Sequence, residues 1–341
     1  MNLLLTSVGR RPYLVRWFLE ALECAGVGGE LFIADSDPWA PARGMGGKFI
    51  LAPKITSEGY ASWLASILES YSIDLAVSIN DFELSRWASL PESSQWDSLM
   101  RLEKPLQKIV EDKYDLTTTL AKHGVAVPPT WLGHQFDVDL TNRDDFITKG
   151  RYGSASRGLR YADRTNIEDA IREASKEVTT QFGGPALEQS EIDPKSLVVV
   201  QERITGQEYG LDIVCDFNGS FAGVLARKKL VMRGGETDRA ITVDPVQFED
   251  LASKVSNAVP HQGTFDVDVI VDSSGRQFVI DVNPRFGGGY PLSHVAGANI
   301  PRAYIAWALG GQADPNSLVT RIGVAASKYV EVIGLDVGEI A

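Results

Sequence analysis

Residues 265–285 constrain the fold more than any other part of this sequence. Two stretches, 265–272 and 277–283, alternate apolar and polar side chains as strands with one buried face do, and Ser274-Gly275 between them is a hairpin signal. The pattern predicts two antiparallel strands joined by a tight turn. A chain that contains this hairpin has to cover its apolar face with further strands or helices.

The predicted hairpin carries acidic and amide side chains on one face. With the predicted turn at its centre, Asp268 lies opposite Asp281. Asp266 then lies opposite Asn283, on the same face. A different turn register would change these facing pairs, but Asp281 and Asn283 would stay on one side. Like charges directly opposite each other are destabilising, so the cluster needs either a compensating cation or a solvated surface.

We favour a divalent cation over an acid-rich hairpin exposed to solvent. Carboxylate and amide oxygens suit Mg²⁺, which usually takes one or two protein carboxylates and adds water and substrate phosphates. The residues that follow support this choice. Arg285 is placed to reach an anion held by the metal, and the glycine run 287–289 can expose backbone N–H groups as an anion-binding nest. The predicted ligands of Mg²⁺, or of Mn²⁺ in its place, are Asp268, Asp281 and Asn283.

The N-terminal part alternates predicted strands and helices. Strands are predicted over residues 2–6, 30–34, 49–52 and 74–79, and helices over residues 12–25 and 58–71. This alternation implies a mostly parallel sheet with helices on both faces, as in Rossmann domains. The dinucleotide fingerprint G-x-G-x-x-G is missing, because Gly9 stands alone. The domain is therefore expected to be architectural or to bind another ligand, with residues 80–83 at a strand's carboxyl end as candidate substrate contacts.

The pattern changes from Glu103 onward. A predicted helix over residues 113–123, capped by Asp112, is followed by the extended, proline-containing stretch 125–129, which indicates a domain junction. Further strands are predicted over residues 146–149, 198–200 and 209–215, and a helix over residues 166–182. The turn signals at 218–219 and 274–275 favour antiparallel pairing in the C-terminal part.

Lys149 is the second candidate for chemistry. It ends a predicted strand and precedes the loop 150–158, which is rich in glycine, serine and arginine. A lysine charge with donors that close over a ligand suits phosphate binding. The loop lacks the P-loop pattern, however, and surface linkers have similar compositions, so a surface linker is the alternative.

Glu202 and Glu208, on either side of Gly206, are the third candidate. A strand that ends in an acid, followed by a turn and a second acid, can place backbone amides against an adenine edge and a carboxylate against ribose hydroxyls. Taken alone, an ordinary hairpin with exposed glutamates is the simpler interpretation.

Composition and charge exclude several other classes of protein. The 341 residues are 44% hydrophobic and 23% charged, near the averages of globular proteins, which disfavours disorder and coiled coils. A net charge of -12 argues against nucleic-acid and anionic-membrane partners, although residues 149–164 and 227–239 are locally basic. Cys24 and Cys215 form no metal or disulfide pattern, and no apolar run reaches the ~20 residues of a membrane span. With no signal-peptide pattern at its N-terminus, a soluble, cytoplasmic protein is expected.

The order of these features resembles the ATP-grasp superfamily over about residues 105–300. Within it, the motif Asp-x-Asn-Pro-Arg-Phe-Gly-Gly-Gly-Tyr-Pro at 281–291 is most similar to the carbamoyl-phosphate-synthase-like ATP-grasp ligases, a group that includes the pyrrolysine-biosynthesis ligase. The N-terminal part is similar to the pre-ATP-grasp domain of that family. This explains a nucleotide-type fold without its fingerprint.

The resemblance implies an α/β and α+β fold with three parts. A Rossmann-like pre-ATP-grasp domain would cover residues 1–104. A two-part ATP-grasp fold with antiparallel sheets would follow, with a lid subdomain and phosphate loop over residues 105–203 and a C-terminal subdomain with the metal site over residues 204–341.

The resemblance also implies roles for single residues. The implied ATP contacts are Lys113, Lys149, Gly153, Ser154, Ser156, Gly158, Glu202 and Glu208. Asp268, Asp281 and Asn283 would hold Mg²⁺, and Arg285 and Lys149 would be catalytic. The chain departs from the family in two ways. Asp281 stands where members usually have Glu, and the phosphate loop is poorer in glycine than in many members.

The implied activity is that of an ADP-forming carboxylate–amine ligase, which activates an acid as an acyl phosphate and joins it to an amine or another nucleophile. The alternatives are a small-molecule kinase on the same fold and a non-catalytic Mg-ATP-binding regulator. The expected partners are small-molecule acids and amines, without nucleic acid or membrane, and a homodimer is the expected assembly. Substrate candidates are Arg233, Glu236, Gly288, Gly289 and His294. We expect the polar segment 227–239 to line the carboxylate side of the pocket, and a solvated basic loop is the alternative. For His294 the alternative is a packing role.

Overall fold

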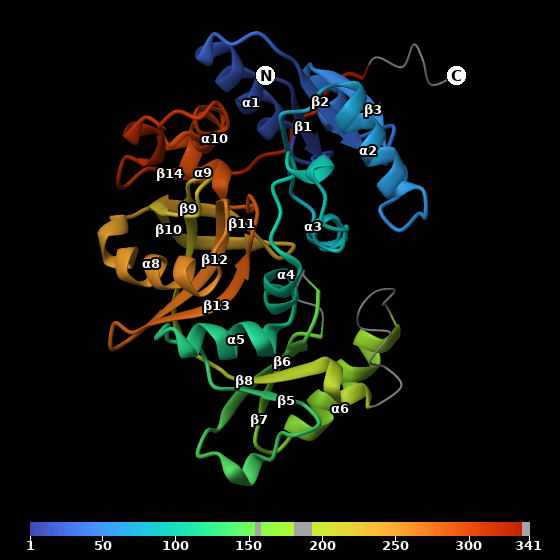
Figure 1. The fold of residues 1–341 in the computed structure, drawn as a ribbon. Coiled ribbons are helices and arrows are strands. Elements are labelled where there is room, and N and C mark those ends of the chain that lie inside the picture. Colours follow the sequence, from blue (N-terminus) through green and yellow to red (C-terminus); the bar gives the residue numbers. More distant parts are fainter. Residues whose placement is uncertain (154–157, 181–192, 336–341) are drawn as a thin grey trace.

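The computed structural model describes residues 1–153, 158–180 and 193–335. Two predicted ATP contacts, Ser154 and Ser156, lie outside these residues. The described part contains three β-sheets, and each draws its strands from one of the three predicted segments of the chain (Figure 1). The domain boundaries themselves stay a prediction.

The N-terminal sheet is parallel, in the order β3-β2-β1-β4. Its strands are β1 (Leu3–Thr6), β2 (Leu31–Asp35), β3 (Lys48–Leu51) and β4 (Leu75–Ser78). Alternate strand residues point to opposite faces. Leu3 and Ile33 pack with Phe18 of α1 (Pro12–Ala25), whereas Leu4 and Phe32 pack with α2 (Tyr60–Ser70) and α3 (Asp81–Ala88). The predicted parallel sheet with helices on both faces is confirmed.

The middle sheet is antiparallel, in the order β5-β8-β6-β7. Its strands are β5 (Thr130–Leu132), β6 (Asp145–Gly150), β7 (Arg160–Asp163) and β8 (Val198–Glu202). Helix α6 (Ile167–Thr180) covers one face, because Ile167 and Ile171 pack against Phe146 and Val200.

The C-terminal sheet is antiparallel, in the order β13-β12-β9-β10-β11-β14. Its strands are β9 (Gly206–Cys215), β10 (Phe221–Arg233), β11 (Glu236–Thr242), β12 (Gly263–Asp272), β13 (Gln277–Asn283) and β14 (Ala325–Ser327). The apolar face holds Val267 and Val282, which pack with Leu116 of α5 (Lys113–Lys122) and Val255 of α8 (Glu249–Ala258). Helix α4 (Lys104–Glu111) leads into α5.

The N-terminal and C-terminal sheets share one hydrophobic core. Helix α10 (Ile300–Ala308) packs on α1, and the ring of Phe18 lies 6.2 Å from that of Tyr304 and 6.0 Å from that of Phe286. The short helix α9 (Tyr290–Val295) follows the glycine run into this interface. The residues at the carboxyl ends of β1, β2 and β4 line a common cavity with polar residues of the C-terminal part. No helix in the described ranges is both long enough and apolar enough to span a bilayer.

The predicted hairpin is present, but its turn differs from the prediction. Asp268 pairs with Asp281 and Asp266 with Asn283, as predicted. Near the turn the register shifts by one residue, because the Asp272 N–H donates to the Arg276 carbonyl and leaves a three-residue loop. A β-bulge at Ile280 restores the register at the acidic end.

Candidate active site

A cavity of about 850 Å³ lies between the N-terminal sheet and the hairpin β12–β13. From the N-terminal sheet it is lined by the residues at the carboxyl ends of β1, β2 and β4, among them Ser7, Asp35, Asp37, Asn80 and Asp81. From the C-terminal sheet it is lined by Lys229, Glu236, Asp266, Asp268, Asp281, Asn283, Arg285, Gly288 and Gly289. Open α/β sheets bind ligands at this edge, so the position agrees with the sequence expectation for residues 80–83.

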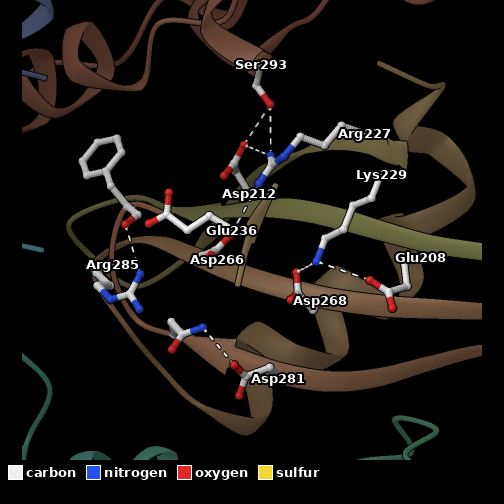
Figure 2. A network of polar contacts seen from close by, with 12 residues as sticks. Glu208, Asp212, Arg227, Lys229, Glu236, Asp266, Asp268, Asp281, Arg285 and Ser293 are labelled. Carbon is white, nitrogen blue, oxygen red and sulfur yellow. Dashed lines mark hydrogen bonds and ion pairs between the residues drawn. The ribbon is translucent and has the colours of Figure 1, made fainter. Parts of the chain in front are cut away.

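Asp268 and Asp281 form the acidic centre of the cavity (Figure 2). Asp268 pairs with Lys229 Nζ at 2.6 Å. Burial raises the pKa of Asp268 to about 6, although Lys229 opposes this shift. Burial alone would also raise the pKa of Asp281, but Lys113 and Lys149 hold it below its ordinary value. Asp281 is therefore ionised at neutral pH, as a metal ligand has to be.

The donor set of this centre fits Mg²⁺. Asp281 and Asn283 lie side by side on β13, where the Asn283 amide donates to Asp281 Oδ2 at 3.3 Å. Across the described residues, no group of three or more His, Cys, Asp and Glu side chains forms a metal site. The candidate set differs from such a group, because it consists of two carboxylates and one amide. All three supply hard oxygen donors, which Mg²⁺ prefers.

Lys149 reaches this centre from the middle sheet. Its Nζ donates to the carbonyl oxygen of Ile280 at 3.1 Å. Ile280 is the bulge residue, which has no partner in the pairing of β12 with β13. Burial lowers the pKa of Lys149 to about 8, against the attraction of Asp281. Lys113 lies close by and donates to the Gly153 carbonyl. The structure therefore brings both predicted phosphate contacts close to Asp281, although neither lysine is among the residues that line the cavity.

The remaining predicted nucleotide contacts lie at strand ends in the middle and C-terminal sheets. Glu202 ends β8 and pairs with Arg143 at 3.0 Å. Glu208 lies on β9, with its carboxylate 3.8 Å from Lys229 Nζ. Gly206 between them approaches β12 so closely that a Cβ atom would lie 2.1 Å from the Val271 carbonyl oxygen. Gly158 is held near β6, where its carbonyl accepts from the Thr148 hydroxyl at 3.2 Å.

Arg285 is fixed by a residue of the N-terminal part. Its Nε and Nη2 donate to the Asp81 carboxylate at 2.6 and 2.9 Å, and Nη1 donates to the Phe286 carbonyl at 3.3 Å. Burial alone would lower the pKa of Arg285, but Asp81 raises it above its ordinary value. The guanidinium stays charged, and Arg285 lines the cavity.

A buried ion pair supports the floor of the cavity (Figure 2). Arg227 is 1% exposed, contacts Asp212 directly and lies 3.4 Å from Asp266. Ser293 donates to Asp212 at 2.9 Å. Burial raises the pKa of Asp212, and Arg227 opposes that shift.

The glycine run packs directly on the polar side chains of this floor. An added Cβ at Gly287 would lie 2.0 Å from the Asp266 carboxyl carbon, and one at Gly289 would lie 2.2 Å from Arg227 Nη2. At Gly288 it would lie 2.7 Å from the Glu236 carboxylate. Close packing is therefore an observed reason for three glycines here, whereas an anion-binding nest stays a prediction.

The predicted substrate residues are not all brought together. Glu236, Gly288 and Gly289 line the cavity. Arg233 is not among its lining residues and extends into solvent, with its Nε 3.6 Å from Asp238. His294 is also outside the lining, and its ring stacks on Trp17 at 3.7 Å. The contact supports the packing alternative for His294.

The sequence places Lys229 and Asp81 within candidate stretches but assigns neither of them an individual role. Lys229 lies in the basic segment 227–239, two residues after Arg227 on the same strand. Because alternate residues of a strand share a face, this spacing could have predicted that both side chains point to the same side. Asp81 lies within the candidate stretch 80–83, but its partner Arg285 is 204 residues away, so no local pattern reveals the pair.

His261 makes the stability of the fold depend on pH. It is buried beneath the hairpin, where the Pro284 carbonyl accepts from its ring, and burial lowers its pKa to about 3. An unfolded histidine titrates near 6.5, so the unfolded chain takes up the proton first and stability falls as pH drops below about 6.5. We expect wild type to lose about 2 kcal/mol more between pH 7 and pH 5 than His261→Gln, by urea unfolding. The exposed His123→Gln is the control, and equal losses for wild type and His261→Gln would contradict the assignment.

Comparisons with known proteins show which sequences and folds the chain resembles. Residues 3–96 match the family model "PylC-like, N-terminal domain", and residues 195–330 match "ATP-grasp in the biosynthetic pathway with Ter operon". The carbamoyl phosphate synthase large chain of Thermotoga sp. (strain RQ2) is 32% identical over 124 residues, which are 30% of this chain and 11% of that protein. The chain thus spans a small part of that relative.

Solved structures show the same fold. The biotin carboxylase domain dimer of Hydrogenobacter thermophilus 2-oxoglutarate carboxylase, in complex with MgADP, ADP and bicarbonate, superposes with a TM-score of 0.71 at 15% identity, covering 95% of this chain and 73% of that one. An L-amino acid ligase from Bacillus licheniformis gives 0.66 at 15% identity, covering 94% and 77%. The resemblance to the carbamoyl-phosphate-synthase-like ATP-grasp proteins and the predicted fold class are confirmed.

Proposed function

We propose that this protein is an ADP-forming ligase that uses ATP to activate a carboxylate as an acyl phosphate and joins it to an amine or another nucleophile. The observation that carries the proposal is that Asp268, Asp281 and Arg285 line one cavity with the N-terminal sheet, while Lys149 contacts the bulge beside Asp281. The L-amino acid ligase among the structural neighbours supports this choice of reaction.

The proposed roles follow the sequence expectation. ATP would contact Lys113, Lys149, Gly153, Ser154, Ser156, Gly158, Glu202 and Glu208. Asp268, Asp281 and Asn283 would hold Mg²⁺ or Mn²⁺, which when bound neutralises phosphate charge. The neighbour in complex with MgADP supports this cofactor. Because that neighbour is described as a dimer, a homodimer is the proposed assembly.

The chemistry requires positioning and charge neutralisation more than proton transfer. A substrate carboxylate oxygen bonds to the γ-phosphorus as the bond from that phosphorus to the ADP oxygen breaks. Lys229 and Arg285 in the cavity lining, together with Lys149 beside the bulge, would supply positive charge around this point. The nucleophile then bonds to the acyl carbon and phosphate leaves, while the proton of the amine passes to solvent. We propose that the substrate end of the cavity includes Glu236, Gly288 and Gly289.

The test is an ADP-release screen over pairs of amino acids, small carboxylates and amines. A ligase requires both an acid and a nucleophile for turnover, and the Asp281→Ala, Arg285→Ala double variant should give only background ADP. A kinase would release ADP and form a phosphorylated product with one substrate alone. A regulator would bind Mg-ATP but release no ADP with any pair, and equal ADP from wild type and the double variant would refute the assigned site.

A further inference from the structure

Within the described part of the chain, contacts use three of the N–H donors of the Arg285 guanidinium. Nε and Nη2 form the side edge and both donate to Asp81. The Phe286 carbonyl takes one N–H of Nη1. Arginine carries five N–H donors in a rigid fork, so one N–H of Nη1 and one of Nη2 remain. These two N–H groups, one on each terminal nitrogen, are donors of the kind that bind the oxygens of a carboxylate or a phosphoryl group.

Asp81 is itself held firmly. It is the first residue of α3, where the Asn80 side chain caps the helix by accepting from the Phe82 N–H at 2.9 Å. A buried carboxylate two residues later, Glu83, accepts four hydroxyl hydrogen bonds of 2.5 to 2.8 Å. Their donors are Thr6, Ser7, Tyr60 and Ser78. An anionic residue is also favoured at the first turn of a helix.

The pair joins two separate parts of the fold at the cavity. Asp81 comes from the N-terminal sheet region and Arg285 from the end of the hairpin, and both line the cavity. Their side chains are 30% and 11% exposed, so solvent screens the pair only partly. A bidentate pair fixes both the plane and the distance of the guanidinium, which a single hydrogen bond would not do.

We propose that Asp81 is a positioning residue, which orients the remaining N–H donors of Arg285 toward the phosphoryl group in transfer. This inference rests on the proposed function, since it assigns that role to Arg285. Asp81 then acts only through Arg285. Its removal should weaken binding of a transition-state mimic much more than binding of MgADP, because charge complementarity to the transferring group is what Arg285 supplies.

The test measures MgADP affinity with and without aluminium fluoride by calorimetry on the full chain. Asp81→Asn should weaken the fluoride complex about 10- to 100-fold and MgADP less than about twofold. Asp81→Glu, which keeps the charge, should recover part of the loss. Glu30→Gln, which removes an exposed ion pair with Lys48 in the N-terminal sheet, should match wild type. Thermal melting of each variant identifies any that do not fold.

A double variant separates positioning from a structural role. If Asp81 acts through Arg285, Asp81→Asn in an Arg285→Ala background should cause no further loss. The inference would be overturned if the two substitutions weakened the MgADP–aluminium fluoride complex independently, so that their fold-losses multiplied. It would also be overturned if Asp81→Asn bound that complex as tightly as wild type. In both cases the proposed function stands. If wild type forms a tight fluoride complex yet no acid and amine pair yields product, the ligase proposal falls and the role of Asp81 in phosphoryl transfer stands. A wild type whose affinity does not respond to fluoride would overturn both.

Discussion

Asp281→Asn is expected to lower kcat/KM for ADP release by about 10²- to 10³-fold, the order of loss when one group that stabilises transition-state charge is removed. The substitution keeps the shape of the side chain but removes its negative charge, which Lys113 and Lys149 stabilise by lowering the pKa of Asp281. The Mg²⁺ concentration needed for half-maximal rate should rise with it, because an amide is the weaker ligand for a hard cation. Initial rates over a Mg²⁺ titration measure both quantities.

Two further variants sharpen this experiment. Asp281→Glu restores the residue usual in the related family and keeps the charge, so we expect it to retain activity within about tenfold of wild type. Asp272→Asn changes another acid of the same hairpin. The Asp272 carboxylate accepts hydrogen bonds from Ser274 and Arg276 in the turn, and Asp272 is not among the residues that line the cavity. This substitution should leave the Mg²⁺ dependence unchanged. An active Asp281→Asn enzyme with a wild-type Mg²⁺ requirement would show that the metal site lies elsewhere.

The hairpin shows how far the sequence predicts the site. Alternation of apolar and acidic residues places Asp268 opposite Asp281, because one face of the strands has to be buried. The same reasoning misses the three-residue turn and the bulge at Ile280, whose two shifts cancel at the acidic end. Bulges depend on local backbone geometry and leave no periodic signal, yet this one supplies the carbonyl that Lys149 contacts.

Contacts between distant segments are the part that sequence reasoning does not supply. The glycine run can be noticed in the sequence, but its close approach to Arg227 and Asp266 depends on how the loop after β13 folds back on β10 and β12. Likewise, the basic segment 227–239 is visible as charge alone. Strand pairing decides which of its members turn inward, so that Arg227 and Lys229 are buried and Arg233 is exposed.

Arg227→Met is expected to lower the free energy of unfolding by about 3–5 kcal/mol, because it leaves Asp212 buried without its cation. Adding Asp212→Asn should recover at least half of that loss, since the amide carries no charge and can still bond Ser293. Lys228, the next residue on the same strand, has a partly exposed side chain. Its substitution Lys228→Met should change the free energy of unfolding by less than about 0.5 kcal/mol. Urea unfolding of the three variants measures these differences.

The pH dependence of that loss identifies its cause. Burial already raises the pKa of Asp212 in the wild type, where Arg227 opposes the shift. Without Arg227 the folded-state pKa should rise further above the unfolded value near 3.9, so the native state of the variant binds a proton more readily than the unfolded chain. Stability is then regained as pH falls, and Arg227→Met should lose less at pH 5 than at pH 8 relative to wild type. A loss that is equal at both pH values would attribute the effect to packing of the Arg227 side chain over Gly210 and Gly289 instead of to the uncompensated charge.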